Sequence, residues 1–192
     1  MRTKLRSWSK RARPGHTLAA FGILALSACI GGVPVVTPVQ VNSYDPSMLS
    51  YAAGNGGMHV EIYGNPFGGE QAAFEEKVAN ALTKAHRGPD FPVTPEKAAN
   101  QQTVYRLVMA FNTPHPGYRI CRTPGGEAAA GSPVTVYAAL CHGGRSVTSL
   151  SGQIAASSPD DPAFDSLMTQ VAANLLPARN PDMDGANGAD FE

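Results

Sequence analysis

The sequence predicts an α+β domain in which a small antiparallel sheet packs two helices on one face. Two observations predict it. Short runs with alternating apolar and polar residues are typical of half-buried strands, and two longer segments repeat apolar residues every three or four positions, as amphipathic helices do. In chain order the elements read β-α-β-(β)-β-β-α. With 192 residues, 43% of them apolar, the chain is sized for one domain.

The first elements are predicted to be helix, strand, helix and strand. A two-turn helix is expected after Asp45, which is a good N-cap, with Gly54 after its end. Met58–Tyr63 alternates in polarity and ends at a Gly-Asn-Pro turn. A surface helix follows over residues 70–86, and the clearest strand signal covers 103–111. The apolar stripe of the surface helix consists of Phe74, Val78, Ala81, Leu82 and Ala85.

The remaining elements are predicted to be strands and one final helix. Tyr118–Arg122 is expected to form a short strand, and Pro133–Cys141 is expected to pair with Arg145–Ile154 across the Gly143-Gly144 turn. The last helix begins after Asp161, which serves as its N-cap. Its apolar stripe consists of Phe164, Leu167, Met168, Val171 and Leu175.

The formal charge of zero hides a strong asymmetry along the chain. Six of the fifteen Lys and Arg residues lie in the first thirteen positions, and every acidic residue lies at Asp45 or later. Without its first thirteen residues the chain carries nine positive and fifteen negative groups, a net charge of −6. A nucleic-acid partner is therefore not expected, because binding phosphates requires a basic surface.

The cationic start is followed by the apolar stretch Thr17–Ala28, as in a secretory signal. As a helix it would be roughly 18 Å long, at about 1.5 Å per residue, whereas the hydrocarbon core of a bilayer is about 30 Å thick. The stretch is too short for an ordinary membrane-spanning anchor.

The end of this stretch, Leu26-Ser27-Ala28-Cys29, resembles the lipobox of bacterial lipoprotein precursors. The resemblance implies that signal peptidase II cuts between Ala28 and Cys29, that the thiol of Cys29 is diacylglycerylated, and that its new amino group is acylated. Acyl chains of this kind would hold the protein at a membrane. Ile30 follows the cysteine where inner-membrane lipoproteins tend to have Asp, so the resemblance points to the outer membrane, facing the periplasm.

Four segments are expected from these patterns. Residues 1–28 form the signal peptide. Residues 29–57 hold the lipidated cysteine, an extended tether with spaced prolines and the short helix. The α+β domain covers 58–177, and 178–192 form a mobile acidic tail.

Cys121 and Cys141 remain as an even pair once Cys29 is lipidated. In an oxidising compartment a disulfide is the favoured interpretation, and closing a loop of about twenty residues would stabilise the fold by about 3 kcal/mol. Two free buried thiols and a reactive or metal-binding pair remain as alternatives.

Neighbouring histidines raise two chemical hypotheses for these cysteines. Cys141-His142 suggests a nucleophile with its base, but neighbours in a strand point to opposite faces. A zinc site could combine Cys121 and Cys141 with His142 and His115, although the paired spacings of structural zinc sites are missing. Neither catalysis nor a metal is expected here.

Three further motifs are incomplete. Gly64–Gly69 lies between a strand and a helix, as phosphate loops do, but lacks their Gly-Lys-Ser/Thr ending. His59-Val60-Glu61 matches half of a deaminase signature without its cysteines. Asn180–Gly185 resembles the start of an EF-hand loop, yet the twelfth position is Phe191. A turn, a strand and a solvated tail are the expected structures.

The functional expectation is an envelope lipoprotein that acts as a non-catalytic adaptor or accessory subunit of an envelope assembly. It would be attached to the membrane by its acyl chains, bind an envelope protein and use no cofactor. One alternative is a periplasmic module that binds a small ligand between sheet and helices or at the loop Asn112–Gly117. The other is a hydrolase whose site carries no recognised motif.

Overall fold

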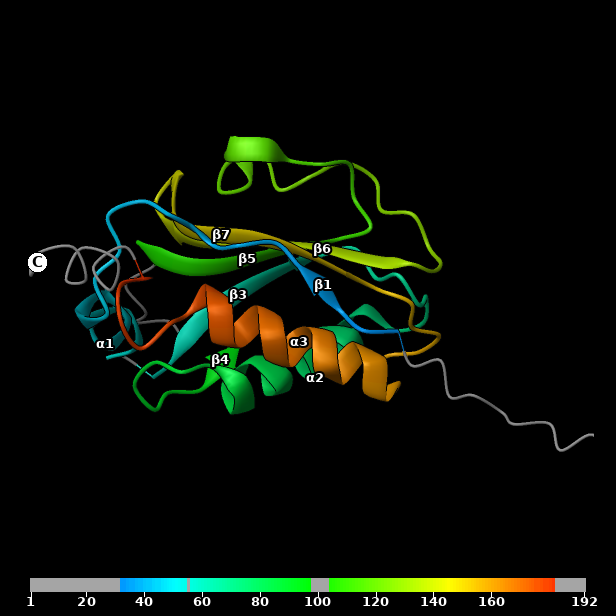
Figure 1. Cartoon of the computed structure of the whole chain (residues 1–192), viewed down its shortest axis with the longest axis horizontal. Coiled ribbons are helices and arrows are strands. Elements are labelled where there is room, and N and C mark those ends of the chain that lie inside the picture. Colours follow the sequence, from blue (N-terminus) through cyan, green and yellow to red (C-terminus); the bar gives the residue numbers. More distant parts are fainter. Residues whose placement is uncertain (1–31, 55, 98–103, 182–192) are drawn as a thin grey trace, which may run out of the picture. The chain divides into compact units, whose positions relative to one another are not determined.

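A mixed sheet of seven strands forms the centre of the domain (Figure 1). The computed structural model describes residues 32–54, 56–97 and 104–181, all within the unit Gly31–Glu192. The spatial order of the strands is β1-β7-β6-β5-β3-β4, with β2 also paired to β7. The strands are β1 (Val35–Val36), β2 (Gln40–Val41), β3 (Met58–Tyr63), β4 (Val93–Thr94), β5 (Tyr105–Phe111), β6 (Val134–His142) and β7 (Arg145–Ile154).

The α+β class is confirmed, but the sheet is not wholly antiparallel as predicted. Strands β5, β6 and β7 are antiparallel neighbours, whereas β3 runs parallel to both β5 and β4. The cause is the connection after β3. A helix in that connection returns the chain to the end of the sheet where β3 began, so β5 starts in the same direction as β3.

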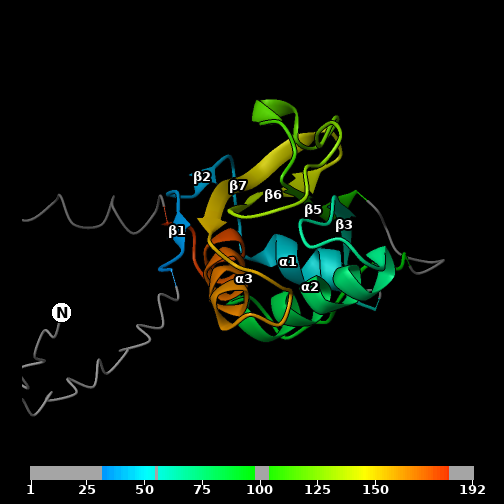
Figure 2. The ribbon, with the colours of Figure 1, turned by 90° about the vertical axis from the view of Figure 1, so that its right-hand side faces the viewer.

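The two predicted amphipathic helices cover one face of this sheet. They are α2 (Gln71–Ala85) and α3 (Pro162–Leu175), which lie side by side below the strands (Figure 1 and Figure 2). The rings of Phe74, Phe111 and Phe164 meet between helices and sheet, with 5.0 Å between the centroids of Phe74 and Phe111. This interlocked apolar layer is the main core.

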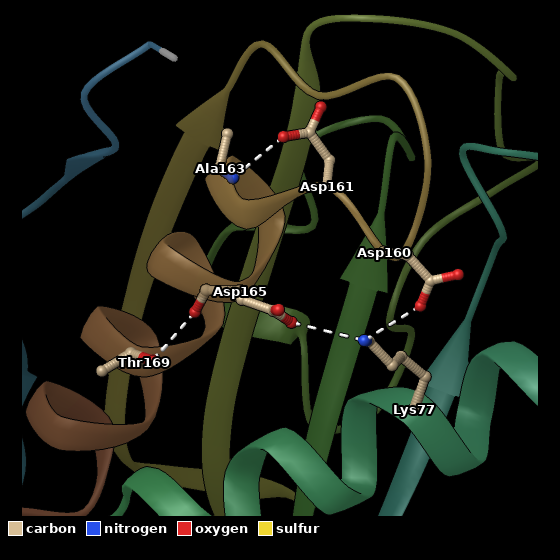
Figure 3. Close-up of polar contacts among 6 residues, drawn as sticks. All are labelled: Lys77, Asp160, Asp161, Ala163, Asp165 and Thr169. Carbon is tan, nitrogen blue, oxygen red and sulfur yellow. Dashed lines mark hydrogen bonds and ion pairs between the residues drawn. The ribbon is translucent and has the colours of Figure 1, made fainter.

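Polar contacts define where α3 begins (Figure 3). The Asp161 carboxylate accepts a hydrogen bond of 2.9 Å from the backbone N–H of Ala163, which confirms the predicted N-cap. Lys77 on α2 lies 3.1 Å from a carboxylate oxygen of Asp160 and 3.6 Å from one of Asp165. These exposed pairs orient the start of α3 against α2 but contribute little free energy.

The segment predicted as a free tether is built into the domain. Its strands β1 and β2 pair antiparallel with β7, and helix α1 (Ser47–Ala53) follows. Tyr44, Leu49 and Ala52 are buried in the main core. The expected boundary at residue 58 is therefore wrong. Although 32–41 has no periodic pattern, it completes the unpaired edge of β7, which would otherwise expose backbone groups.

Several predictions fall on other parts of the chain. The signal peptide, Cys29 and residues 182–192 lie outside the described residues. In the part of the chain that the structure describes, no helix is long and apolar enough to cross a bilayer. Residues 178–181, predicted as the start of the tail, are described, and the amide of Asn180 donates a hydrogen bond of 2.9 Å to the carbonyl of Tyr44.

Candidate functional site

The connection between β5 and β6, residues 112–133, crosses the sheet face opposite α2 and α3 (Figure 1 and Figure 2). It contains a short 3-10 helix, η1 (Gly117–Arg119). Beneath it lies a second, smaller apolar cluster that joins this connection to β5 and β6. The members of this cluster are Val108, Ile120, Cys121, Ala139 and Cys141, with Tyr137 packed against them.

Cys121 and Cys141 form a disulfide with their Cα atoms 5.7 Å apart, and both residues are buried. The favoured prediction is confirmed. The alternatives of two free thiols or a reactive or metal-binding pair are wrong, because neither sulfur is available as a thiolate. The disulfide fixes the segment that follows η1 to β6.

The predicted strand at Tyr118–Arg122 is wrong, because this segment is a series of turns. The N–H of Arg119 donates to the carbonyl of Pro116, and the N–H of Arg122 donates to that of Arg119 at 2.7 Å. Gly117 has a φ of +56°, which glycine adopts readily. The adjacent residues Ile120 and Cys121 are both buried, whereas neighbours in a strand point to opposite faces.

Arg106 on β5 makes polar contacts that hold the disulfide loop and the β6–β7 turn on this face of the sheet. Its guanidinium donates to the carbonyl of Cys121 at 2.8 Å and to the carbonyl of Gly143 at 2.9 Å. Its Nε lies 2.8 Å from the carboxylate of Glu61 on β3. One side chain therefore links β5 to β3, to the disulfide loop and to the β6–β7 turn, and its charge is balanced by Glu61.

A groove of about 480 Å³ opens between the η1 connection, β7 and the N-terminal segment. Hydroxyl and amide side chains make up much of its lining: Thr37, Gln40, Asn42, Ser146, Ser149 and Ser151. Tyr118 also lines the groove and is 83% exposed. His115 also lines the groove.

An adjoining pocket of about 420 Å³ shares Asn42, Tyr118 and Ser146 with the groove. Arg119, Arg122 and Arg145 line it. We call these three residues the arginine cluster. Among the described residues, the ion pairs involve Lys77 and Arg106 and none of these three. The arginine cluster therefore presents three positive charges on exposed side chains, none of them paired with a carboxylate of the described residues.

Local structure explains why these arginines converge. Arg119 and Arg122 flank Cys121, Arg145 begins β7 after the hairpin turn, and the disulfide joins the two segments. A Cβ at Gly144 would lie 2.8 Å from Arg122 Nε, so this glycine leaves room for the side chain to cross the turn. Arg119 Cζ lies 5.7 Å from the ring centroid of Tyr118, a cation–π distance.

The structure separates the residues of the two histidine hypotheses. Cys141 belongs to the smaller cluster, whereas His142 stacks on Tyr105, with ring centroids 4.5 Å apart. His115 packs edge-on against Tyr137. Within residues 32–54, 56–97 and 104–181 no group of three or more His, Cys, Asp or Glu residues is arranged to hold a metal ion.

Two of the remaining motifs have structural roles, while most of Asn180–Gly185 lies outside the described residues. Glu61 pairs with Arg106, and burial is the main cause that lowers the pKa of the nearby His59. In the Gly64–Gly69 turn, Asn65 accepts from the N–H of Phe67 at 3.0 Å and donates to the carbonyl of Gly68 at 2.8 Å. These contacts are those of a strand and a turn, as expected.

Sequence reasoning did not identify the arginine cluster. Its members lie up to 26 positions apart and form no spacing motif. One signal could have found them, since two of them flank Cys121 and the third follows the turn next to Cys141. A disulfide between these cysteines necessarily brings the arginines together.

No family model matches the chain, and no curated protein matches it. Among solved structures, a PelC dodecamer from Paraburkholderia phytofirmans is 19% identical, with a TM-score of 0.42, over 77% of this chain and 99% of that one. A variant of the same protein gives the same identity and TM-score over 76% and 99%.

Proposed function

We propose that the chain is a lipid-anchored lipoprotein of the cell envelope with a non-catalytic, accessory role, and that it binds an envelope protein through the groove beside η1. The anchor is Cys29, on the basis of the lipobox described above. The outer membrane, with the domain facing the periplasm, is the proposed location. The disulfide is consistent with an oxidising compartment.

The groove lies on the face of the sheet that the two long helices do not cover. Helices α2 and α3 close one face of the sheet. The outermost strands β1, β2 and β4 have only two residues each, and Pro34, Pro38, Pro92 and Pro95 flank them. Short, proline-flanked edges resist pairing with another chain. Beside η1, a partner finds a recess of about 480 Å³ whose lining comes from three separate segments of the chain.

The chemistry of the groove carries the proposal. Hydroxyl and amide groups can pair with the N–H and C=O groups of a polypeptide, and an exposed tyrosine such as Tyr118 is a common anchor at protein interfaces. Its lining includes no acidic residue and no cysteine that could act beside His115 as acid, base or nucleophile. Binding is the function that this lining supports best.

Binding of a small ligand is the second candidate, because a volume of about 480 Å³ is within the range of small-molecule sites. Native mass spectrometry of protein taken from cells distinguishes binding of a small ligand from binding of an envelope protein. A reproducible added mass of small-molecule size favours this second candidate.

Photocrosslinking from the groove tests the adaptor role directly. We expect a photoreactive residue in place of Tyr118 to give a discrete crosslinked protein product in intact cells. The matched control replaces Tyr51, which is 66% exposed on α1 and does not line the groove. Equal products from both positions, or none from Tyr118, would contradict binding through the groove.

The anchor is tested separately by Cys29→Ala. Without the thiol, no diacylglyceryl group can be attached, and we expect the protein to move from the membrane fraction to the soluble periplasmic fraction. Membrane retention of this variant at the level of the unmodified chain would contradict lipid anchoring.

A further inference from the structure

We propose that residues 182–192 bind the arginine cluster of the same chain, so that the groove is partly occupied by the protein's own acidic segment. This inference rests on the proposed role of the groove as the binding site. We call residues 182–192 the acidic segment. Its acidic residues are Asp182, Asp184, Asp190 and Glu192.

Charge complementarity is the first argument. The arginine cluster has three positive charges and no ion pair with a described residue. The acidic segment has four carboxylates and no Lys or Arg in eleven residues. Guanidinium groups bind carboxylates through paired hydrogen bonds, and this geometry favours arginine over lysine for such contacts.

The place where the described chain ends is the second argument. Thr148 on β7 donates to the carbonyl of Leu175 at the end of α3, and Asn180 donates to the carbonyl of Tyr44. Tyr44 is two residues from Asn42, which lines the arginine pocket. The acidic segment therefore starts close to the pocket, and eleven residues at about 3.3 Å each reach about 36 Å.

The consequence concerns access to the groove. The arginine pocket and the groove share Asn42, Tyr118 and Ser146. An acidic segment bound to the arginines covers one end of the surface that a partner would use. A partner then has to displace it, and a partner with carboxylates of its own is best suited to do so.

NMR of the purified, ¹⁵N-labelled full chain tests the proposal without any partner. The variant replaces all four carboxylates of the acidic segment: Asp182→Asn, Asp184→Asn, Asp190→Asn and Glu192→Gln. We expect backbone amide resonances of residues 119–122 and 143–146 to shift relative to the unmodified chain. The difference should disappear in 1 M salt, where the Debye length is about 3 Å instead of about 10 Å at 0.1 M.

A matched control removes four negative charges elsewhere, through Glu70→Gln, Glu75→Gln, Glu76→Gln and Asp90→Asn on and beside α2. It should leave resonances 119–122 and 143–146 unchanged. Similar shifts in variant and control would mean that the change in net charge alone causes them, and would overturn the proposal. Shifts that depend on protein concentration would also overturn it, because they would assign the contact to a second copy.

Gly144→Ala tests the geometry at constant charge. A Cβ there would lie 2.8 Å from Arg122 Nε and 3.2 Å from its Cγ, so Arg122 has to move. We expect neutralisation of the acidic segment to cause smaller shifts in this background. Absence of a partner in the crosslinking experiment would contradict the proposed function alone, whereas unchanged resonances after neutralisation would contradict this inference alone.

Discussion

Tyr44 shows how a single side chain can attach both ends of the domain to each other. It is 3% exposed, its hydroxyl donates to the carbonyl of Pro177, and its own carbonyl accepts from Asn180. Burial, together with the neighbouring charge of Asp45, raises the pKa of the Tyr44 hydroxyl to about 12. The N-terminal segment and the end of α3 therefore meet at one buried hydroxyl.

We predict that this contact makes the domain sensitive to alkaline pH. In the unfolded chain Tyr44 ionises near pH 10, while in the folded chain it keeps its proton up to about pH 12. The unfolded state thus binds fewer protons, and the contribution of Tyr44 to stability is lost as pH rises above 10. Tyr44→Phe should reduce this dependence in urea unfolding between pH 9 and 11, and should cost about 1 kcal/mol at neutral pH.

Tyr118→Phe is the control for this experiment, since Tyr118 is almost fully exposed. It should change neither the pH dependence nor the stability. An unchanged pH dependence in Tyr44→Phe would mean that the raised pKa of Tyr44 does not contribute to alkaline unfolding.

At the scale of elements, Gly152 determines how closely α3 packs on the sheet. A Cβ at this position of β7 would lie 2.7 Å from Leu167 Cδ1, 3.4 Å from Val171 Cγ2 and 3.5 Å from Val136 Cγ1. Side chains from α3 and from β6 therefore fill the space that a side chain at Gly152 would occupy. Interiors packed this densely have little room for added atoms.

We predict that Gly152→Val destabilises the domain by about 1–3 kcal/mol, because α3 has to move outward. Chemical denaturation measures the loss. Gln153→Val makes the adjacent, exposed residue of β7 apolar and should leave stability nearly unchanged. Equal stability of the two variants would contradict the close packing of α3 at Gly152.

Which elements the sequence could predict follows from their length and pattern. Helices α2 and α3 have long apolar stripes, and the predicted limits of β3 and β7 coincide with the observed ones. Strands β1 and β2 have two residues each, too few for any periodicity. Parallel pairing of β3 and β5 depends on contacts between distant residues, which a local pattern does not contain.

The candidate site was less predictable than the fold. The disulfide was predicted because two cysteines in an oxidising compartment usually pair. The groove was not predicted, because its lining comes from three separate segments: the N-terminal segment, the η1 connection and the β6–β7 hairpin. The polar residues of these segments are of types that also occur in ordinary exposed loops. Arg119, Arg122 and Arg145 form no spacing motif, and their closeness to the predicted Cys121–Cys141 disulfide was the one sequence signal for their cluster.

At the scale of the whole molecule, the segment ahead of β3 is part of the folded unit. Leu49 on α1 is completely buried, and a Cβ added at Gly88 would lie 2.7 Å from its Cδ1. We predict that Leu49→Ala lowers the free energy of unfolding of the entire domain by about 2–5 kcal/mol in a single transition. Thermal or denaturant unfolding followed by circular dichroism measures this.

Ser50→Ala changes the next, exposed residue of α1 and should have little effect. If Leu49→Ala were as stable as Ser50→Ala, residues 32–54 would behave as the independent tether that their sequence suggested.

The pairing of β1 and β2 with β7 has a mechanical consequence. Tension applied to the chain ahead of residue 32 reaches the domain through two short ladders, Val35–Val36 against Gly152–Gln153 and Gln40–Val41 against Thr148–Ser149. These few hydrogen bonds carry the load before any strand of the main core does. Because Thr37 and Gln40 line the groove, we expect a pull that detaches β1 and β2 to open the groove before the strands of the main core separate.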